Sequence, residues 1–71
     1  MTTVDIRGEP CGMPVLRVER VLKEGRAFDV LGDSEETMEQ LQLLASRHGW
    51  SCALSREGAD WRAAFVPKAT G

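Results

Sequence analysis

The chain has 71 residues, of which 42% are hydrophobic and 28% are charged. This length excludes a two-domain enzyme, and the composition is that of a globular protein rather than a disordered tail. Nine Lys and Arg against eleven Asp and Glu give a net charge of -2, so the overall charge attracts neither nucleic acid nor an anionic membrane. We expect one domain over residues 1–71, with residues 68–71 frayed.

Two cysteines and one histidine limit the metal and disulfide chemistry of the chain. They provide neither a disulfide framework nor the ligands of a Cys/His zinc site, so we expect no metal and no cofactor. The longest uninterrupted apolar run, residues 63–66, is far shorter than a membrane span, and no secretory leader pattern is present. These features predict a cytoplasmic protein without a membrane partner.

Taken in chain order, the hydrophobic periodicity first predicts a strand, a helix and a second strand. Residues 2–7 alternate as a strand, and a helix follows from Pro14 to about Glu24, because proline suits the first helical position. Gly25 suits the end of this helix, and residues 26–31 alternate as a strand. One helix face collects the apolar residues Val15, Val18, Val21 and Leu22.

The second half of the chain predicts a longer helix and a hairpin. Asp33 and Glu36 have the form of a capping box for a helix over residues 34–48. Residues 50–56 and 61–67 alternate as strands with a short turn-rich link, which suits an antiparallel hairpin. The β-α-β-α-β-β order predicts an α/β (α+β) two-layer sandwich, with a small mixed four-stranded sheet and both helices on one face. Its outer sheet face meets either water or a second copy, so we expect a monomer or a weak dimer.

The main candidate for chemistry is Cys11, in a loop rich in glycine and proline before the first predicted helix. Free backbone N–H groups and the positive helix end lower the pKa of a thiol at such a position. Gly12 beside it has no side chain and leaves the sulfur open to a partner. The alternative is an inert, buried small hydrophobe, and spacing alone leaves both interpretations open.

A basic stripe, Arg17, Arg20 and Lys23, is predicted on the exposed side of the same helix. It offers a docking surface for an acidic protein or a phosphate backbone. Leu16 lies among these charges near Cys11, which favours a partner contact over an isolated exposed leucine. No aromatic residue interleaves the stripe, so we expect no direct nucleic-acid binding.

Other polar candidates have structural explanations. His48, at the end of the second predicted helix, is a partner for the helix dipole or a filler at the core edge rather than a catalytic group. Cys52 alternates in phase with the apolar residues of its strand, which favours a buried structural thiol over a second carrier cysteine. Asp5 and Arg7 either support the loop by hydrogen bonds or solvate the outer face of an edge strand.

The segment VDIRGEPCGMPVL, residues 4–16, resembles the signature of the TusA (SirA-like) sulfurtransferase family. That signature places an apolar strand, an Asp and a glycine turn before Cys-Pro-x-Pro at the first helix. Cys11 matches the persulfide-bearing cysteine and Pro14 the second proline, whereas Gly12 stands where the family has proline. The predicted loop-supporting positions are Asp5, Arg7, Gly8, Pro10, Gly12 and Pro14.

The resemblance implies a sulfur carrier, a sulfurtransferase that takes persulfide sulfur onto Cys11 from a cysteine desulfurase or another persulfide donor. A downstream acceptor protein then receives the sulfur, and in the family such relays feed tRNA thiolation, sulfur metabolism and molybdenum-cofactor assembly. The alternative is a non-catalytic binding or regulatory module that uses the basic stripe, with Gly12 marking lost chemistry. Persulfide exchange needs an exposed thiolate and no general base, so the absence of further catalytic groups fits a carrier.

Overall fold

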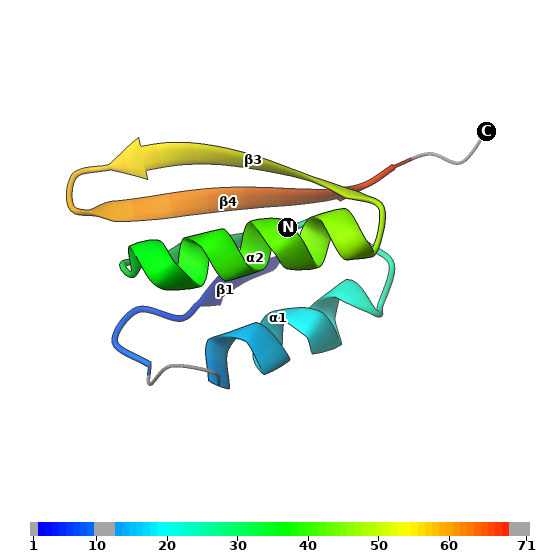
Figure 1. The fold of residues 1–71 in the computed structure, drawn as a ribbon, viewed down its shortest axis with the longest axis horizontal. Coiled ribbons are helices and arrows are strands. Elements are labelled where there is room, and N and C mark those ends of the chain that lie inside the picture. Colours follow the sequence, from blue (N-terminus) through cyan, green and yellow to red (C-terminus); the bar gives the residue numbers. More distant parts are fainter. Residues whose placement is uncertain (1, 10–12, 69–71) are drawn as a thin grey trace.

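The structure is a computed structural model that describes residues 2–9 and 13–68. Its elements are β1 (Thr2–Asp5), α1 (Met13–Leu22), β2 (Phe28–Gly32), α2 (Glu35–Arg47), β3 (Trp50–Glu57) and β4 (Asp60–Pro67), as labelled in Figure 1. The predicted order of elements is confirmed. The predictions for Pro10, Cys11 and Gly12 lie outside the described residues, as do residues 69–71 of the expected frayed end.

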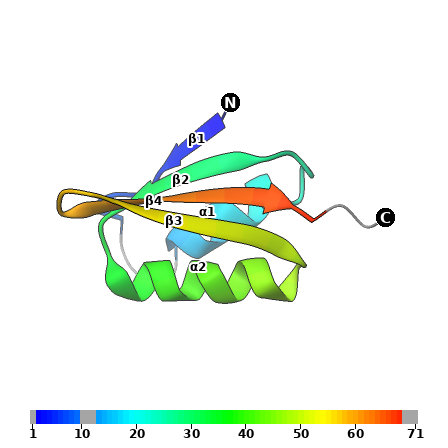
Figure 2. The same cartoon turned by 90° about the horizontal axis from the view of Figure 1, so that it is seen from above.

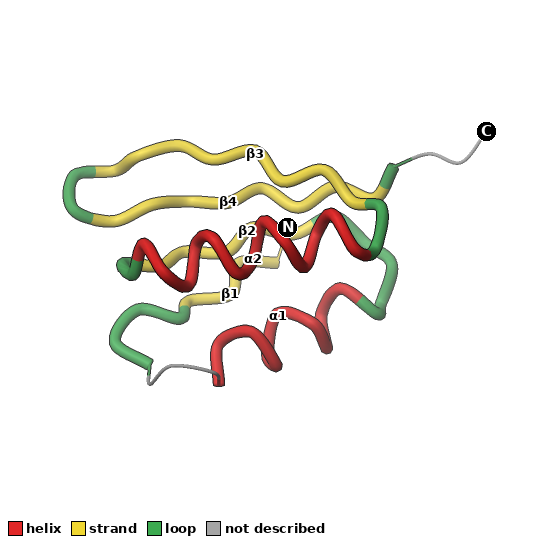
Figure 3. Tube along the Cα trace, in the orientation of Figure 1, coloured by secondary structure: helices red, strands yellow, loops and turns green. Residues whose placement is uncertain are grey.

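The four strands form one mixed sheet in the order β1-β2-β4-β3. β1 runs parallel to β2, as a crossover through a helix allows, and Val4 lies opposite Val30. β4 is antiparallel to both of its neighbours, so Ala63 lies opposite Val30 on one side and Leu54 on the other. The last strand of the chain therefore lies inside the sheet, and the long β3–β4 hairpin can be followed along the trace in Figure 3.

Both helices cover the same face of the sheet, as Figure 2 shows, which confirms the predicted two-layer architecture. The core lies between the layers because alternate residues of β2 and β4 point toward the helices. Phe28 and Phe65 lie opposite each other there, and their rings stack with centroids 4.9 Å apart. The buried apolar residues are Val4, Ile6, Val18, Leu22, Phe28, Val30, Leu41, Leu44, Ala45, Trp61, Ala63 and Phe65.

The boundaries of α1 differ slightly from the prediction. The helix begins at Met13, so Pro14 is its second residue rather than its first. Proline is tolerated there because the first turn has no intrahelical acceptor for its missing N–H. The helix ends at Leu22, and the Gly25 N–H donates to the Leu22 carbonyl at 3.1 Å with a φ of 80° at Gly25. This left-handed turn, which favours glycine, ends α1 two residues before the predicted Glu24.

The predicted capping box of Asp33 and Glu36 is wrong by one residue. Ser34 is the N-cap of α2, and its hydroxyl accepts a hydrogen bond from the Thr37 N–H at 3.3 Å. The buried Trp61 indole also donates through Nε1 to the Ser34 carbonyl at 3.1 Å. This tertiary contact holds Ser34 at the helix start, which the local pattern does not reveal.

Within the described residues, no helix is long and apolar enough to cross a membrane.

Candidate functional site

The loop between β1 and α1 is anchored to the sheet on its N-terminal side. The Ile6 N–H donates to the Leu31 carbonyl at 2.9 Å, which extends the β1–β2 pairing beyond the end of β1. The Glu9 N–H then donates to the Ile6 carbonyl at 3.3 Å around Gly8, whose φ is 75°. A left-handed glycine therefore makes the turn, and the described chain resumes at Met13, the first residue of α1.

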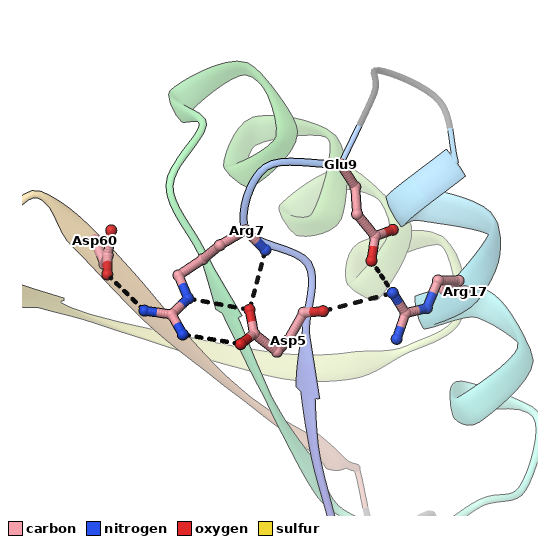
Figure 4. Close-up of polar contacts among 5 residues, drawn as sticks. All are labelled: Asp5, Arg7, Glu9, Arg17 and Asp60. Carbon is pink, nitrogen blue, oxygen red and sulfur yellow. Dashed lines mark hydrogen bonds and ion pairs between the residues drawn. The ribbon is translucent and has the colours of Figure 1, made fainter.

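Arg7 ties this loop both to β1 and to the β3–β4 hairpin, as Figure 4 shows. Its Nε and Nη2 donate to the two Asp5 carboxylate oxygens at 3.1 and 2.9 Å, and its backbone N–H also donates to Asp5 Oδ1 at 3.1 Å. Its Nη1 donates to Asp60 Oδ2 at 3.2 Å. Of the two predicted alternatives, Asp5 and Arg7 therefore follow the first, because they support the loop by hydrogen bonds. Both side chains stay about half exposed.

The charges of Asp5, Arg7 and Asp60 stabilise one another. The side-chain and backbone hydrogen bonds from Arg7 lower the pKa of Asp5 to about 2, and those from Asp5 and Asp60 raise the pKa of Arg7. Asp60 was missed by the sequence analysis because it lies 53 positions from Arg7. Its position at the start of the last strand gave no local signal of this pairing.

Arg17, the first cation of the predicted basic stripe, is bound to the loop. Its Nη1 makes an ion pair with the Glu9 carboxylate and lies 3.5 Å from the Asp5 carbonyl, to which it donates. Arg20 and Lys23 are exposed, and neither makes an ion pair within residues 2–9 and 13–68. In the described part of the chain, the stripe therefore has one cation that is paired with the loop, Arg17, and two that make no ion pair. Glu9, the partner of Arg17, is a further residue that the sequence analysis missed.

Large apolar side chains are exposed on both helices. Met13 and Leu16, in the first half of α1, are each 56% exposed, and Leu43 on α2 is 60% exposed. A shallow groove between the two helices is lined by Val15, Gln40, Leu43, Leu44 and Arg47. The surface that follows the cysteine segment in sequence thus combines apolar contacts with positive charge, a composition that suits a protein partner.

Cys52 and His48 are the two remaining candidates from the sequence. Cys52 packs on the predicted inner face of β3 against the core but is half-buried rather than fully buried, and this burial raises the pKa of its thiol. His48 is the C-cap of α2, with its Nε2 3.9 Å from a Glu19 carboxylate oxygen. In the part of the chain that the structure describes, no three His, Cys, Asp or Glu side chains gather as metal ligands.

Residues 2–66 match the family model of sulfurtransferase TusA. The chain belongs to the TusA family. A relative named as a putative sulfur carrier protein, from Methanocaldococcus jannaschii, is 30% identical over 60 residues, which cover 80% of each chain.

The fold has a close match among solved TusA-like structures. The crystal structure of a SirA-like protein from Desulfitobacterium hafniense aligns with a TM-score of 0.85 at 27% identity, covering 93% of this chain and 96% of that one. The family resemblance carried by the VDIRGEPCGMPVL segment and the α+β fold class are thereby confirmed. The family match extends over that segment, so it includes the sequence positions of Cys11 and Pro14.

Proposed function

We propose that this protein is a sulfur carrier in which Cys11 accepts the terminal sulfur of a protein persulfide and passes it to a second protein. The observation that carries the proposal is the TusA-family match across a segment that places Cys11 two residues before α1. The similarity to a putative sulfur carrier protein supports the same role. Cys52, half-buried and with a raised thiol pKa, is the less suitable of the two thiols.

The proposed transfer is an exchange between two sulfurs and needs no external oxidant or reductant. The Cys11 thiolate attacks the terminal sulfur of a donor Cys–S–SH, so a new S–S bond forms on Cys11. The donor's S–S bond breaks, and its electron pair leaves with the donor sulfur as a thiolate. The proton stays on the transferred sulfur, and the negative charge moves from Cys11 to the donor. The acceptor's thiolate repeats the same exchange with the Cys11 persulfide.

The electrostatics of the loop suit a thiolate at this position. The first turn of α1 contains no acidic residue to offset the positive helix end. Glu9, the nearest acidic residue before Cys11, has its carboxylate paired with Arg17. The first N–H groups of a helix have no intrahelical acceptor, and no acidic residue in the first turn of α1 opposes their positive potential, which favours the ionised form of a nearby thiol.

The partners that fit this site are a cysteine desulfurase or another persulfide donor, and then an acceptor protein. Both need access to Cys11, so we propose that they use the exposed part of α1 in turn. Leu16 supplies an apolar contact there, and Arg20 and Lys23 supply charge for an acidic rim on the partner. Arg17 lies on the same face and also binds the loop.

The test is intact-mass analysis of the wild type and of Cys11→Ser and Cys52→Ser variants after incubation with a cysteine desulfurase and cysteine. We expect one added sulfur, removable by dithiothreitol, on the wild type and on Cys52→Ser, and none on Cys11→Ser. Sulfur on Cys11→Ser, or its loss in Cys52→Ser, would assign the carrier role to the other thiol and contradict the proposal.

One sequence feature favours a second candidate function, a binding module without sulfur transfer. Gly12 stands where the family motif has proline, so the residue after Cys11 lacks a fixed φ. If the protein is such a module, the wild type and the Cys11→Ser variant bind the partner equally well, and neither takes up sulfur. For either function, Arg20→Glu should weaken partner binding more than Arg26→Glu, a matched charge reversal beyond the far end of α1.

A further inference from the structure

Strand β3 forms the longer of the two open edges of the sheet. The order β1-β2-β4-β3 places β1 and β3 at the edges, and β3 has eight residues where β1 has four. Among the described residues no strand lies beyond β3, which runs along the upper side of the molecule in Figure 1. Its pairing with β4 is unbroken from Trp50–Pro67 to Glu57–Asp60, so β3 has no bulge. The outer edge of β3 therefore presents backbone N–H and C=O groups to which another strand can bind.

The sequence of β3 does little to prevent such pairing. Residues 50–57, WSCALSRE, contain neither the proline nor the lysine that often protects an edge strand. The two charged residues lie at the hairpin end, and both are paired within the chain. Arg56 makes an ion pair with Glu35, and Glu57 makes one with Arg62. No unpaired charge on β3 therefore repels an added strand.

The apolar face of the sheet ends at β3 only partly covered. Val30 and Ala63 are fully buried, whereas Leu54, the next residue of the same row across the sheet, is half-buried. The neighbouring row repeats this pattern, because Phe65 is fully buried and Cys52 beside it is half-buried. A strand added beyond β3 would extend both rows and cover these side chains.

The edge is complementary to a second copy of itself. A twofold axis perpendicular to the sheet pairs β3 with β3 of the second copy in antiparallel fashion, and it keeps the helices of both copies on one face. With the axis at Ala53, residues 50–56 of the two copies pair throughout. Leu54 then lies opposite Cys52 of the second copy, so the two half-buried apolar positions cover each other.

The same register places Trp50 opposite Arg56 of the second copy. The indole is half-buried, and the Arg56 side chain is 59% exposed while it binds Glu35. A guanidinium binds a carboxylate through its N–H groups and stacks on an aromatic ring with its planar face, so the two contacts are compatible. This pair occurs twice about the axis. An axis at Leu54 would instead place Trp50 opposite Gly58 in the hairpin turn, and the pair would be lost.

We propose that the protein forms a dimer through the β3 edges of two copies, in the antiparallel register centred on Ala53. The contact consists of one strand and its flanking side chains, so it belongs to the weak class of interfaces, and we expect a dissociation constant of about 0.1–1 mM. Figure 1 shows β3 and α1 on opposite sides of the molecule, so the dimer leaves α1 of each copy free. The inference goes beyond the proposed function and does not rest on it.

Analytical ultracentrifugation of the full chain under reducing conditions, from about 10 µM to about 1 mM, tests the dimer. We expect the average mass of the wild type to rise toward twice the monomer mass. Ala53→Lys sets two like charges across the axis and should weaken association about tenfold or more. Ala27→Lys is the matched control, because Ala27 is also exposed but precedes β2, and it should associate like the wild type. Thermal unfolding checks that both variants fold.

A wild type that stays monomeric over this range overturns the proposal and leaves β3 open to an extended segment of another protein. Association of Ala53→Lys equal to that of the wild type overturns it as well. Neither measurement needs a sulfur donor. Failure of the wild type to accept sulfur therefore counts against the proposed function alone, and a monomeric wild type counts against the dimer alone.

Cysteine cross-linking tests the register, in a background that carries Cys11→Ser and Cys52→Ser. Ala53→Cys sets two thiols at the axis with Cα atoms about 4.5–5.5 Å apart, within the range of a disulfide. In Ser51→Cys the two thiols lie about 14 Å apart, because Ser51 pairs with Ser55 of the second copy. With oxidised glutathione, we expect Ala53→Cys to cross-link at least about tenfold faster than Ser51→Cys. Equal rates for these two variants overturn the proposed register.

Discussion

Gly32 in β2 lies opposite Trp61 in β4, and the Trp61 ring occupies the space where a side chain on Gly32 would begin. A Cβ at Gly32 would lie 2.4 Å from Trp61 Cζ2 and 2.6 Å from Cη2. The indole is 1% exposed, and its Nε1 donates to the Ser34 carbonyl at the start of α2. One glycine therefore provides the room for the aromatic ring that joins the sheet to the second helix.

We expect Gly32→Ala to destabilise the protein by about 1–3 kcal/mol, because the methyl group displaces a fully buried ring. The measurement is urea-induced unfolding followed by circular dichroism. Trp61→Phe supplies the control, because phenylalanine lacks the clashing ring atoms. Gly32→Ala should cost less in the Trp61→Phe background than in the wild type, and an equal cost in both would contradict a clash with the indole.

The start of α2 gives a second prediction that separates neighbouring residues. Ser34→Ala removes the hydroxyl that accepts from the Thr37 N–H, so we expect a loss of about 0.5–2 kcal/mol in unfolding free energy. Asp33→Ala, one residue earlier, removes no cap and should cost less. The comparison is made by thermal unfolding, and a larger loss from Asp33→Ala would restore the capping box predicted from the sequence.

Asp5 predicts a pH dependence of stability with a definite sign. Its pKa is lowered from 3.8 to about 2 by hydrogen bonds from Arg7, so the folded state favours the carboxylate. The stabilisation is therefore fully present above about pH 4 and is lost as the pH falls toward 2. We expect the difference in melting temperature between the wild type and Asp5→Asn to shrink over this range.

Asp33→Asn is the matched control for that measurement, because Asp33 is exposed and lies outside the Arg7 contacts. A difference between wild type and Asp5→Asn that stays constant from pH 6 to about pH 2 would show that Asp5 contributes nothing through its charge.

Cys52 predicts a thiol that reacts slowly in the folded protein. Burial on the inner face of β3 raises its pKa, which lowers the thiolate fraction at neutral pH. In a Cys11→Ser variant, we expect iodoacetamide to alkylate Cys52 much more slowly in buffer than in a denaturing concentration of urea. Equal rates in the two conditions would place the thiol in contact with solvent and remove the argument for a structural role.

Local sequence patterns predicted the order of the elements and the chemistry of the site. Period-two alternation in residues 2–7 and 61–67 identified strands, because successive side chains of a strand point to opposite faces. The helical stripe that includes Val18 and Leu22 identified α1, and both residues are buried. The VDIRGEPCGMPVL segment was enough to predict the family, because its glycine, cysteine and prolines are close together in the chain.

Tertiary structure decided the contacts between residues distant in sequence. The insertion of β4 between β2 and β3 brings Asp60 to Arg7, and the return of α1 beside the loop brings Arg17 to Glu9. Ser34, rather than Asp33, caps α2 where the Trp61 indole meets its carbonyl. Periodicity records which face of an element is apolar, but an ion pair depends on where that element packs. The sequence by itself therefore determined the elements and the family, and the packing of the sheet determined which charges hold the loop after β1.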